Sequence, residues 1–146
     1  VNTMLHSMFN TIAGKRIAIF GFAFKADTGD TRESPAIRVC RELASERARV
    51  VVSDPKAIEN ARLELADVLD QIEFEEDPYA AAEGAHAIAL LTEWKQYKEL
   101  DFQRIYDSMA RPAFIFDGRN MLDHQALFDM GFEVYSIGKG RKTHLK

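Results

Sequence analysis

The feature that most constrains the fold of this chain is a regular alternation of short apolar runs with amphipathic stretches. The runs are rich in Ile, Val, Ala and Phe and are bounded by glycine, proline or charged residues, which is typical of buried strands. Continuous apolar strands that alternate with helices indicate a parallel sheet covered on both faces. The sequence therefore predicts an α/β fold with a doubly wound, Rossmann-like sheet. Strands are expected over residues 16–22, 49–53, 72–75, 86–91, 113–116 and 133–137.

The amphipathic stretches carry signals for the starts and ends of helices. Ser34 and Pro35 form an N-cap followed by proline at the first helical position, and Asp77 and Pro78 repeat this pattern. Gly131 marks the end of the last helix. Helices are expected after Pro35 and over residues 57–69, 78–83, 98–109 and 123–130. The apolar face of the first helix is expected to consist of Ala36, Ile37, Val39, Cys40, Leu43 and Ala44.

The 146 residues fit one domain, but the two ends differ from the middle. Apolar residues recur every three or four positions from Val1 to Ile12 without a preceding N-cap, so the chain opens inside a helical pattern. We expect residues 1–13 to be the end of an inter-domain connecting helix in a longer protein. Residues 14–138 are expected to form the binding domain and residues 139–146 a basic flexible tail. A complete domain with a processed first residue is the alternative.

The composition excludes several classes of function. A net charge of −4 argues against nucleic acid and anionic membranes as partners, because both attract basic proteins. No apolar run approaches the ~20 residues that span a bilayer, and no signal peptide is recognised. The single cysteine, Cys40, cannot form an internal disulfide, which fits a cytoplasmic protein. No His or Cys cluster has the spacing of a metal site, so no metal is expected.

Ligands of open α/β sheets bind outside the carboxyl ends of the strands, and this rule selects four loops. They cover residues 23–34, 54–56, 92–97 and 117–121. The first is too long for a plain turn and dense in charge. It lacks the G-x-G-x-x-G fingerprint, because Phe22 and Phe24 stand where a pyrophosphate would need glycine. The domain is therefore not expected to hold a dinucleotide by itself.

Three side chains of the first loop fit a phosphorylated ligand. Lys25 supplies a mobile cation and Arg32 a planar fork of donors, and both suit phosphates. Phe24 could pack against an apolar face of the ligand. The alternative is a solvated charged loop with its own Asp–Arg pairs. In the last loop, Gly118 permits a sharp turn after the strand, which would make Arg119 project from the ligand-binding edge. The alternative is that Arg119 is a plain surface arginine.

Four other residues favour structural roles. Trp94, the only tryptophan, is interpreted as a packing residue rather than a stacking platform. Asp54 stands where a dinucleotide fold keeps its ribose-binding acid, but the following proline favours a structural turn. His86 begins a buried strand without neighbouring ligands and is interpreted as structural. Cys40 lies on the inner face of a helix, so a buried, inert thiol is expected.

Together these loops resemble the nucleotide-sugar dehydrogenases, the UDP-glucose/GDP-mannose dehydrogenase family. The resemblance covers nearly the whole chain. Its motifs are Gly21-Phe22-Ala23-Phe24-Lys25, Thr28-Gly29-Asp30-Thr31-Arg32-Glu33-Ser34-Pro35, Asp54-Pro55, Thr92-Glu93-Trp94 and Phe116-Asp117-Gly118-Arg119. The stretch from Gly21 to Pro35 is highly specific in combination, and the others support it. The chain is thereby identified as the C-terminal, UDP-sugar-binding domain of that family.

The resemblance implies an activity and a set of partners. In this family UDP-glucose is oxidised twice at C6, with two NAD⁺, to UDP-glucuronate, and an N-terminal Rossmann domain binds the NAD. It implies that Phe24, Lys25 and Arg119 bind the UDP-sugar and that Arg32 reaches NAD across the cleft. It also implies a homo-oligomeric enzyme. Catalysis does not transfer, because the family's catalytic cysteine precedes this chain and Cys40 matches no family nucleophile.

Two alternatives stay open at this point. Related dehydrogenases of UDP-N-acetylmannosamine or GDP-mannose share part of the pattern from Lys25 to Pro35, although the motifs at residues 28–32 and 92–94 lean towards the UDP-glucose branch. A free-standing α/β nucleotide-binding module is the second alternative, and the truncated opening helix argues against it.

Overall fold

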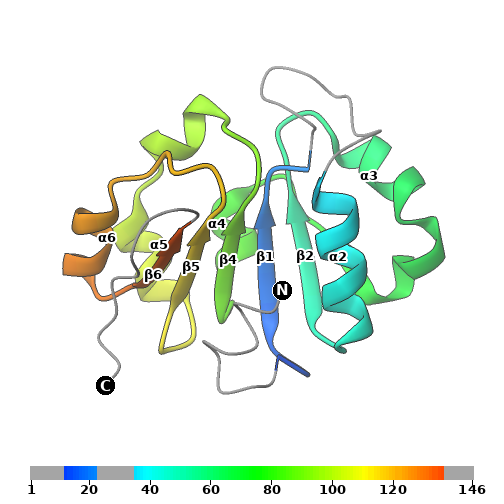
Figure 1. The fold of residues 1–146 in the computed structure, drawn as a ribbon, viewed down its shortest axis with the longest axis horizontal. Helices are drawn as coiled ribbons and strands as arrows, with labels where there is room; N and C mark the ends of the chain where they lie inside the picture. The colour runs from blue at the N-terminus through cyan, green and yellow to red at the C-terminus, as the bar shows by residue number, and fades with distance from the viewer. Residues whose placement is uncertain (1–11, 23–34, 137–146) are drawn as a thin grey trace.

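The strands form one sheet of six parallel strands. The computed structural model describes residues 12–22 and 35–136. The strand order is β3-β2-β1-β4-β5-β6, with β1 and β4 adjacent at the centre (Figure 1). All six expected strands are confirmed, and the strand predicted over residues 49–53 has the bounds that were expected. The strands are β1 Arg16–Phe20, β2 Arg49–Ser53, β3 Ile72–Phe74, β4 Ala87–Leu90, β5 Phe114–Asp117 and β6 Glu133–Ser136.

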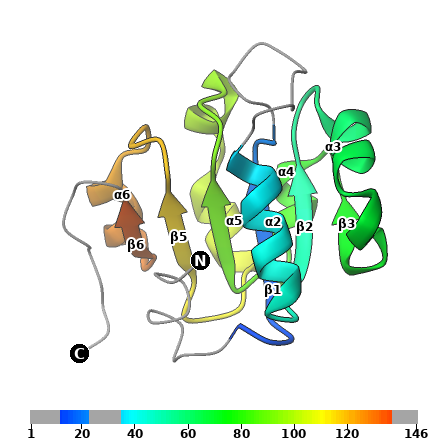
Figure 2. The ribbon, with the colours of Figure 1, turned by 45° about the vertical axis from the view of Figure 1, so that its right-hand side comes forward.

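Helices cover the sheet on both faces, so the predicted doubly wound α/β fold is confirmed. Helix α2 crosses the near face over β1 and β2, while α4 and α5 lie behind the sheet (Figures 1 and 2). The helices are α2 Pro35–Ser45, α3 Ile58–Glu64, α4 Pro78–Ala82, α5 Phe102–Ser108 and α6 His124–Met130. Two 3-10 segments, η1 Ala66–Gln71 and η2 Lys95–Glu99, complete the connections.

Side-chain capping places the starts of the short helices. The carboxylate of Asp77 accepts a hydrogen bond from the backbone N–H of Tyr79 at 2.9 Å and starts α4. Asp123 accepts from the backbone N–H of Ala126 at 3.1 Å and starts α6. These bonds satisfy N–H groups that have no partner within the helix, which is why aspartate favours this position. Gly131 ends α6 with a φ of 120°, as expected from the sequence.

Two predicted helices are wrong in their extent. The helix expected over residues 57–69 breaks at Leu65, which is fully buried, and η1 follows with a non-helical φ of −130° at Val68. The helix expected over residues 98–109 begins at Phe102, because the side chain of Asp101 caps it by accepting from the backbone N–H of Arg104 at 3.1 Å.

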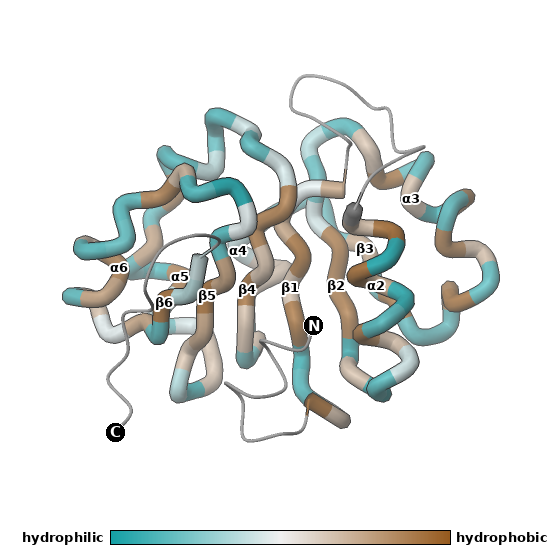
Figure 3. The backbone as a smooth tube through the Cα atoms, viewed as in Figure 1, coloured by the Kyte–Doolittle hydropathy of each residue, from teal (hydrophilic) through white to brown (hydrophobic). Residues whose placement is uncertain are grey.

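The core lies between the sheet and its helices. The central strands are brown with apolar residues, and the outer turns of the helices and loops are largely teal (Figure 3). Ile17, Ile19 and Phe20 of β1 are fully buried. In α2 the predicted apolar face is confirmed, since Cys40 and Leu43 are fully buried while the intervening polar residues face outward. Burial of this apolar area supplies the main driving force for folding.

The exit of β1 is packed tightly against the exit of β4. Gly21 has a φ of 96°, and a Cβ added there would lie 2.5 Å from Cβ of Thr92. Its N–H donates to the carbonyl oxygen of Ser53, at the end of β2, at 2.8 Å. Only glycine fits this approach, so the chain enters the loop at residues 23–34 from one defined point at the carboxyl edge.

The two ends of the chain fall largely outside the described residues. This applies to the connecting helix expected over residues 1–13, of which Ile12 and Ala13 are described, and to the basic tail expected over residues 139–146. Ile12 is buried in the core cluster. Among the described residues, no helix is both long enough and apolar enough to cross a membrane.

Candidate functional site

Three of the four loops selected from the sequence meet at the carboxyl edge of the sheet in the described structure. They follow β2, β4 and β5, and the fourth loop leaves β1 through Phe22. Phe24, Lys25 and Arg32 belong to residues 23–34 and lie outside the described residues. Their roles therefore stay predictions from the sequence. Arg119 lies within the described part, directly after β5.

Asp54 joins the exits of three strands. Its side chain is 1% exposed. One carboxylate oxygen accepts from the backbone N–H groups of Lys56 and Ala57, both at 2.8 Å. The other accepts from the backbone N–H of Phe22 at 2.7 Å and from the indole N–H of Trp94 at 3.3 Å. The interpretation of Asp54 as a structural turn residue is confirmed.

This arrangement bears on dinucleotide binding. In the Rossmann strand order, the acid after the second strand binds the ribose of the cofactor. Here that acid, Asp54, is buried and accepts four hydrogen bonds from its own chain. A carboxylate in this environment cannot reach a ribose hydroxyl without losing those bonds. Asp54 is therefore engaged within its own chain, which differs from the role of the ribose-binding acid in a dinucleotide fold.

Two aromatic residues of the loop after β4, Trp94 and Tyr97, are buried. Trp94 is 5% exposed, which confirms its interpretation as a packing residue, and the Lys56 ammonium lies 5.9 Å from the centre of its ring. The Tyr97 ring stacks on Phe20 at a centroid distance of 5.5 Å, and its hydroxyl donates to the carbonyl oxygen of Ser53 at 3.3 Å. Burial, reinforced by the nearby Asp54, raises the pKa of Tyr97, so this hydroxyl stays a donor.

Asp117 organises the loop that carries Arg119. It is 1% exposed, and one oxygen accepts from the backbone N–H of Arg119 at 3.1 Å. The other oxygen accepts from the backbone N–H of Leu122 at 2.9 Å and lies 2.8 Å from Nε2 of His124. Sequence reasoning missed this Asp–His pair. The available signal was an aspartate ending a strand and a histidine at the first position of the next helix.

The turn after Asp117 is hydrogen-bonded to the end of β4. The N–H of Gly118 donates to the carbonyl oxygen of Leu90 at 2.9 Å, and a Cβ at Gly118 would lie 3.0 Å from that oxygen. Asn120 adopts a left-handed conformation with a φ of 53°. The backbone before Arg119 is thus held by the contact of Gly118 with Leu90, and the backbone after it turns at Asn120.

Arg119 pairs with Glu93, and so the structure brings together two of the motifs found in the sequence. The Nη2 atom of Arg119 lies 2.6 Å from Oε2 of Glu93, and the two side chains are 40% and 37% exposed. The Oε2 atom of Glu93 is shielded from solvent. Arg119 therefore stands at the carboxyl edge as a partly exposed cation, and its role in binding a ligand stays a prediction.

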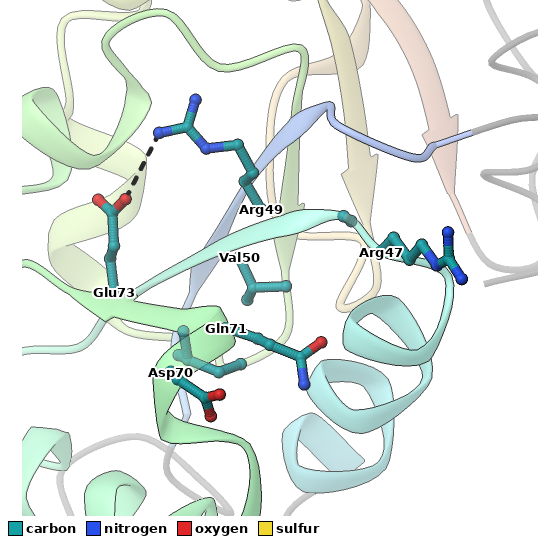
Figure 4. Close-up of a pocket in the computed structure, with 8 residues that line it drawn as sticks. Arg47, Arg49, Val50, Asp70, Gln71 and Glu73 are labelled. Atoms are coloured by element: carbon teal, nitrogen blue, oxygen red, sulfur yellow. Dashed lines mark ion pairs between the residues drawn. The ribbon is translucent and has the colours of Figure 1, made fainter.

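A pocket lies at the opposite edge of the sheet, away from the four loops selected from the sequence. It has a volume of about 310 Å³ and lies at the amino ends of β2 and β3 (Figure 4). Glu73 forms ion pairs with Arg49 at 3.7 Å and with Arg16 at 3.1 Å. Glu73 is therefore already paired, and open α/β sheets bind their ligands at the other edge.

Two further residues are confirmed as structural. Nδ1 of His86 accepts from the backbone N–H of Arg16 at 3.1 Å, and burial, with the charge of Lys15, lowers the pKa of His86. Cys40 is fully buried, and burial raises the pKa of its thiol to about 12, so the reactive thiolate does not form near neutral pH. Within residues 12–22 and 35–136, no group of three or more His, Cys, Asp or Glu side chains is placed to hold a metal.

Comparison with known proteins finds dehydrogenases of nucleotide sugars among the relatives of this chain. The chain is 45% identical to UDP-glucose 6-dehydrogenase 5 of Oryza sativa subsp. japonica in an alignment 164 positions long. This match covers 100% of this chain and 34% of that protein. It resembles the structure of a UDP-glucose dehydrogenase from Pyrobaculum islandicum, with a TM-score of 0.68 and 29% identity, over 89% of this chain and 28% of that one. A UDP-D-ManNAc dehydrogenase from Pyrococcus horikoshii gives a TM-score of 0.73 and 26% identity, over 95% and 29%.

The chain spans about a third of the length of the curated relatives it matches. Residues 18–124 match the model of the UDP-glucose/GDP-mannose dehydrogenase family, UDP binding domain. The matched range runs from the middle of β1 to the start of α6 and includes Asp54, Glu93, Asp117 and Arg119. With the strand order and the loops at the carboxyl edge, this match leads to one conclusion: the chain belongs to the UDP-glucose/GDP-mannose dehydrogenase family and comprises its UDP binding domain.

Proposed function

We propose that this domain binds the UDP-sugar of an NAD-dependent UDP-glucose 6-dehydrogenase, which oxidises UDP-glucose with two NAD⁺ to UDP-glucuronate. The observation that carries the proposal is the position of Arg119. It is a partly exposed cation at the carboxyl end of β5, beside the end of β4, where an open α/β sheet places its ligand. The relatives above 40% identity support UDP-glucose as the sugar nucleotide.

The proposed substrate contacts come from Phe24, Lys25 and Arg119. Phe22 begins the loop that carries Lys25, and β4 alone separates β1 from β5. Neighbouring strands lie ~4.8 Å apart, so the ends of β1 and β5 lie about 10 Å apart. A nucleoside diphosphate can bridge this span. Lysine and arginine on its two sides would neutralise the phosphates with charge-assisted hydrogen bonds.

Arg32 is proposed to serve the cofactor. It lies seven residues after Lys25, near the start of α2, so the two side chains can face different ligands. The occupation of Asp54 by its own chain supports this division, because a dinucleotide fold uses the acid at that position for the ribose. When NAD is bound it accepts the hydride of the oxidation. In this proposal Arg32 contacts a cofactor held mainly by another domain of the protein.

The proposal gives this chain a binding role and no catalytic residue. Its single cysteine, Cys40, is buried in the core with a pKa raised to about 12. We propose that the nucleophile and the NAD domain belong to an N-terminal part of a longer, homo-oligomeric, cytoplasmic enzyme. Residues 1–13 would end its connecting helix, residues 14–138 would form the substrate domain and residues 139–146 its tail. The 146-residue chain is expected to produce no NADH from UDP-glucose and NAD⁺ above a blank without protein.

A calorimetric titration of this chain with UDP, GDP and NAD⁺ tests the proposal. UDP is expected to bind weakly, because the other half of the cleft contributes the remaining contacts. GDP is expected to bind more weakly than UDP, and NAD⁺ not to bind measurably. Preference for GDP would support the GDP-mannose branch instead. Tight binding of NAD⁺ would contradict the assignment of the cofactor to another domain. The same titration with UDP-N-acetylmannosamine and UDP-glucose separates the two UDP-sugar branches.

A further inference from the structure

The ion pair between Arg119 and Glu93 links the ends of two adjacent strands. Glu93 belongs to the loop after β4, and Arg119 to the loop after β5. The 2.6 Å contact joins a carboxylate oxygen of Glu93 to a guanidinium nitrogen of Arg119, so the two opposite charges hold the side chains together. Arginine has five N–H donors, so this contact leaves others for a second anionic partner.

The backbone beneath this pair is already held from both sides. Asp117 accepts from the N–H of Arg119, and Gly118 donates to Leu90. On the other side, Thr92 is fully buried against Gly21. The long, partly exposed side chain of Arg119 extends from this held backbone. A cation on such a chain loses rotamer freedom when it binds a ligand, unless something already orients it.

We propose that Glu93 is a positioning residue for Arg119, and this inference rests on the proposed function of the same site. In the unliganded protein Glu93 holds the guanidinium at the carboxyl edge, so that its remaining donors meet the diphosphate of a UDP ligand with less loss of conformational freedom. Glu93 itself does not contact the nucleotide. The opposite effect, in which Glu93 competes with the phosphates for Arg119, is the outcome that would overturn the inference.

The test is a titration of UDP into this chain, followed by NMR, for four variants. Arg119→Ala is expected to weaken UDP binding by about 10-fold or more. Glu93→Ala is expected to weaken it by about 3- to 10-fold, because the guanidinium is no longer oriented before binding. Glu93→Gln retains an oxygen facing the guanidinium and should recover part of the loss. The double variant Glu93→Ala/Arg119→Ala should bind no more weakly than Arg119→Ala alone.

A matched pair in helix α2 supplies the control. Arg38 and Glu42 form an ion pair at 2.9 Å on the exposed surface of α2. Arg38→Ala and Glu42→Ala should leave the UDP affinity unchanged. Unchanged or tighter binding by Glu93→Ala would overturn the positioning role, and so would independent losses that multiply in the double variant. If Arg119→Ala leaves binding unchanged, the proposed nucleotide site itself is wrong.

A second readout does not depend on UDP binding. The side-chain N–H signals of Arg119 in the free protein report whether its guanidinium is held. We expect slowed rotation and slowed exchange with water in the parent chain and in Glu42→Ala, and loss of both in Glu93→Ala. Identical signals in the parent and in Glu93→Ala would show that Glu93 does not position Arg119, whatever the outcome of the titration.

Discussion

Two buried aspartates at the carboxyl edge of the sheet have different structural roles. Asp54 follows β2 and Asp117 follows β5, and both are 1% exposed and accept hydrogen bonds from N–H donors. Within the described residues, N–H donors to Asp54 come from three loops, as far as 40 residues away in the sequence. Those of Asp117 come from its own loop and the start of the next helix, at most seven residues away. Asp54 therefore joins loops to one another, and Asp117 shapes a single loop.

The largest expected effect is that of Asp54→Asn. Each oxygen of Asp54 faces two N–H donors, so the NH₂ of asparagine would meet two donors whichever way the amide turns. The free energy of unfolding should fall by about 3–5 kcal/mol, since each buried donor without an acceptor costs about 1–3 kcal/mol. Urea denaturation followed by circular dichroism measures it.

The control for this variant is Asp77→Asn. Asp77 caps an exposed helix end, where asparagine is as favourable as aspartate, so stability should hardly change. A loss below about 1 kcal/mol for Asp54→Asn would contradict the role of Asp54 in joining the loops.

Asp117→Asn should cost less and sharpens the comparison. Asparagine can keep its carbonyl oxygen towards Leu122 and His124 and turn its NH₂ towards the single N–H of Arg119. One unsatisfied donor predicts a loss of about 1–3 kcal/mol in the free energy of unfolding. The same urea denaturation measures it. Equal losses for the two aspartates would remove the distinction between a local and a long-range role.

The two cations proposed to bind UDP belong to these two different regions of the molecule. Lys25 belongs to the loop that starts beside Asp54, and Arg119 to the loop shaped by Asp117. A charge-assisted hydrogen bond contributes about 1.5–3 kcal/mol, so replacing either residue by alanine in the longer enzyme should weaken UDP-glucose binding by about 10- to 150-fold. Affinity for NAD⁺ and the thermal midpoint serve as controls and should change little. If both variants bind UDP-glucose as the parent does, these loops are not the nucleotide site.

The smallest expected effect separates the roles of two cations in the loop at residues 23–34, Lys25 and Arg32. Arg32→Ala in the longer enzyme should raise the KM for NAD⁺ more than the KM for UDP-glucose, because Arg32 is assigned to the cofactor. Steady-state kinetics with each substrate varied in turn gives both values, and Lys25→Ala should show the reverse order. Equal changes in both KM values would count against this division.

Much of the fold could be read from local patterns. The apolar run at residues 49–53 became β2 with the same bounds, and Cys40 and Leu43 were placed correctly on the buried face of α2. Such features depend on periodicity and on turn residues within a few positions of one another. Helix extents were less predictable. The break at Leu65 coincides with full burial of that side chain, whereas the start at Phe102 follows a local signal, the Asp101 cap, that the prediction did not use.

For the candidate site, the sequence by itself determined which loops reach the carboxyl edge, and that Arg119 stands there. Tertiary structure alone decided that Asp54 bonds to Phe22 and Trp94 and that Arg119 pairs with Glu93. The physical reason is strand order. β1 lies between β2 and β4, and β4 lies between β1 and β5. This order brings together loops that are far apart in the chain, and no local pattern encodes which of their side chains meet.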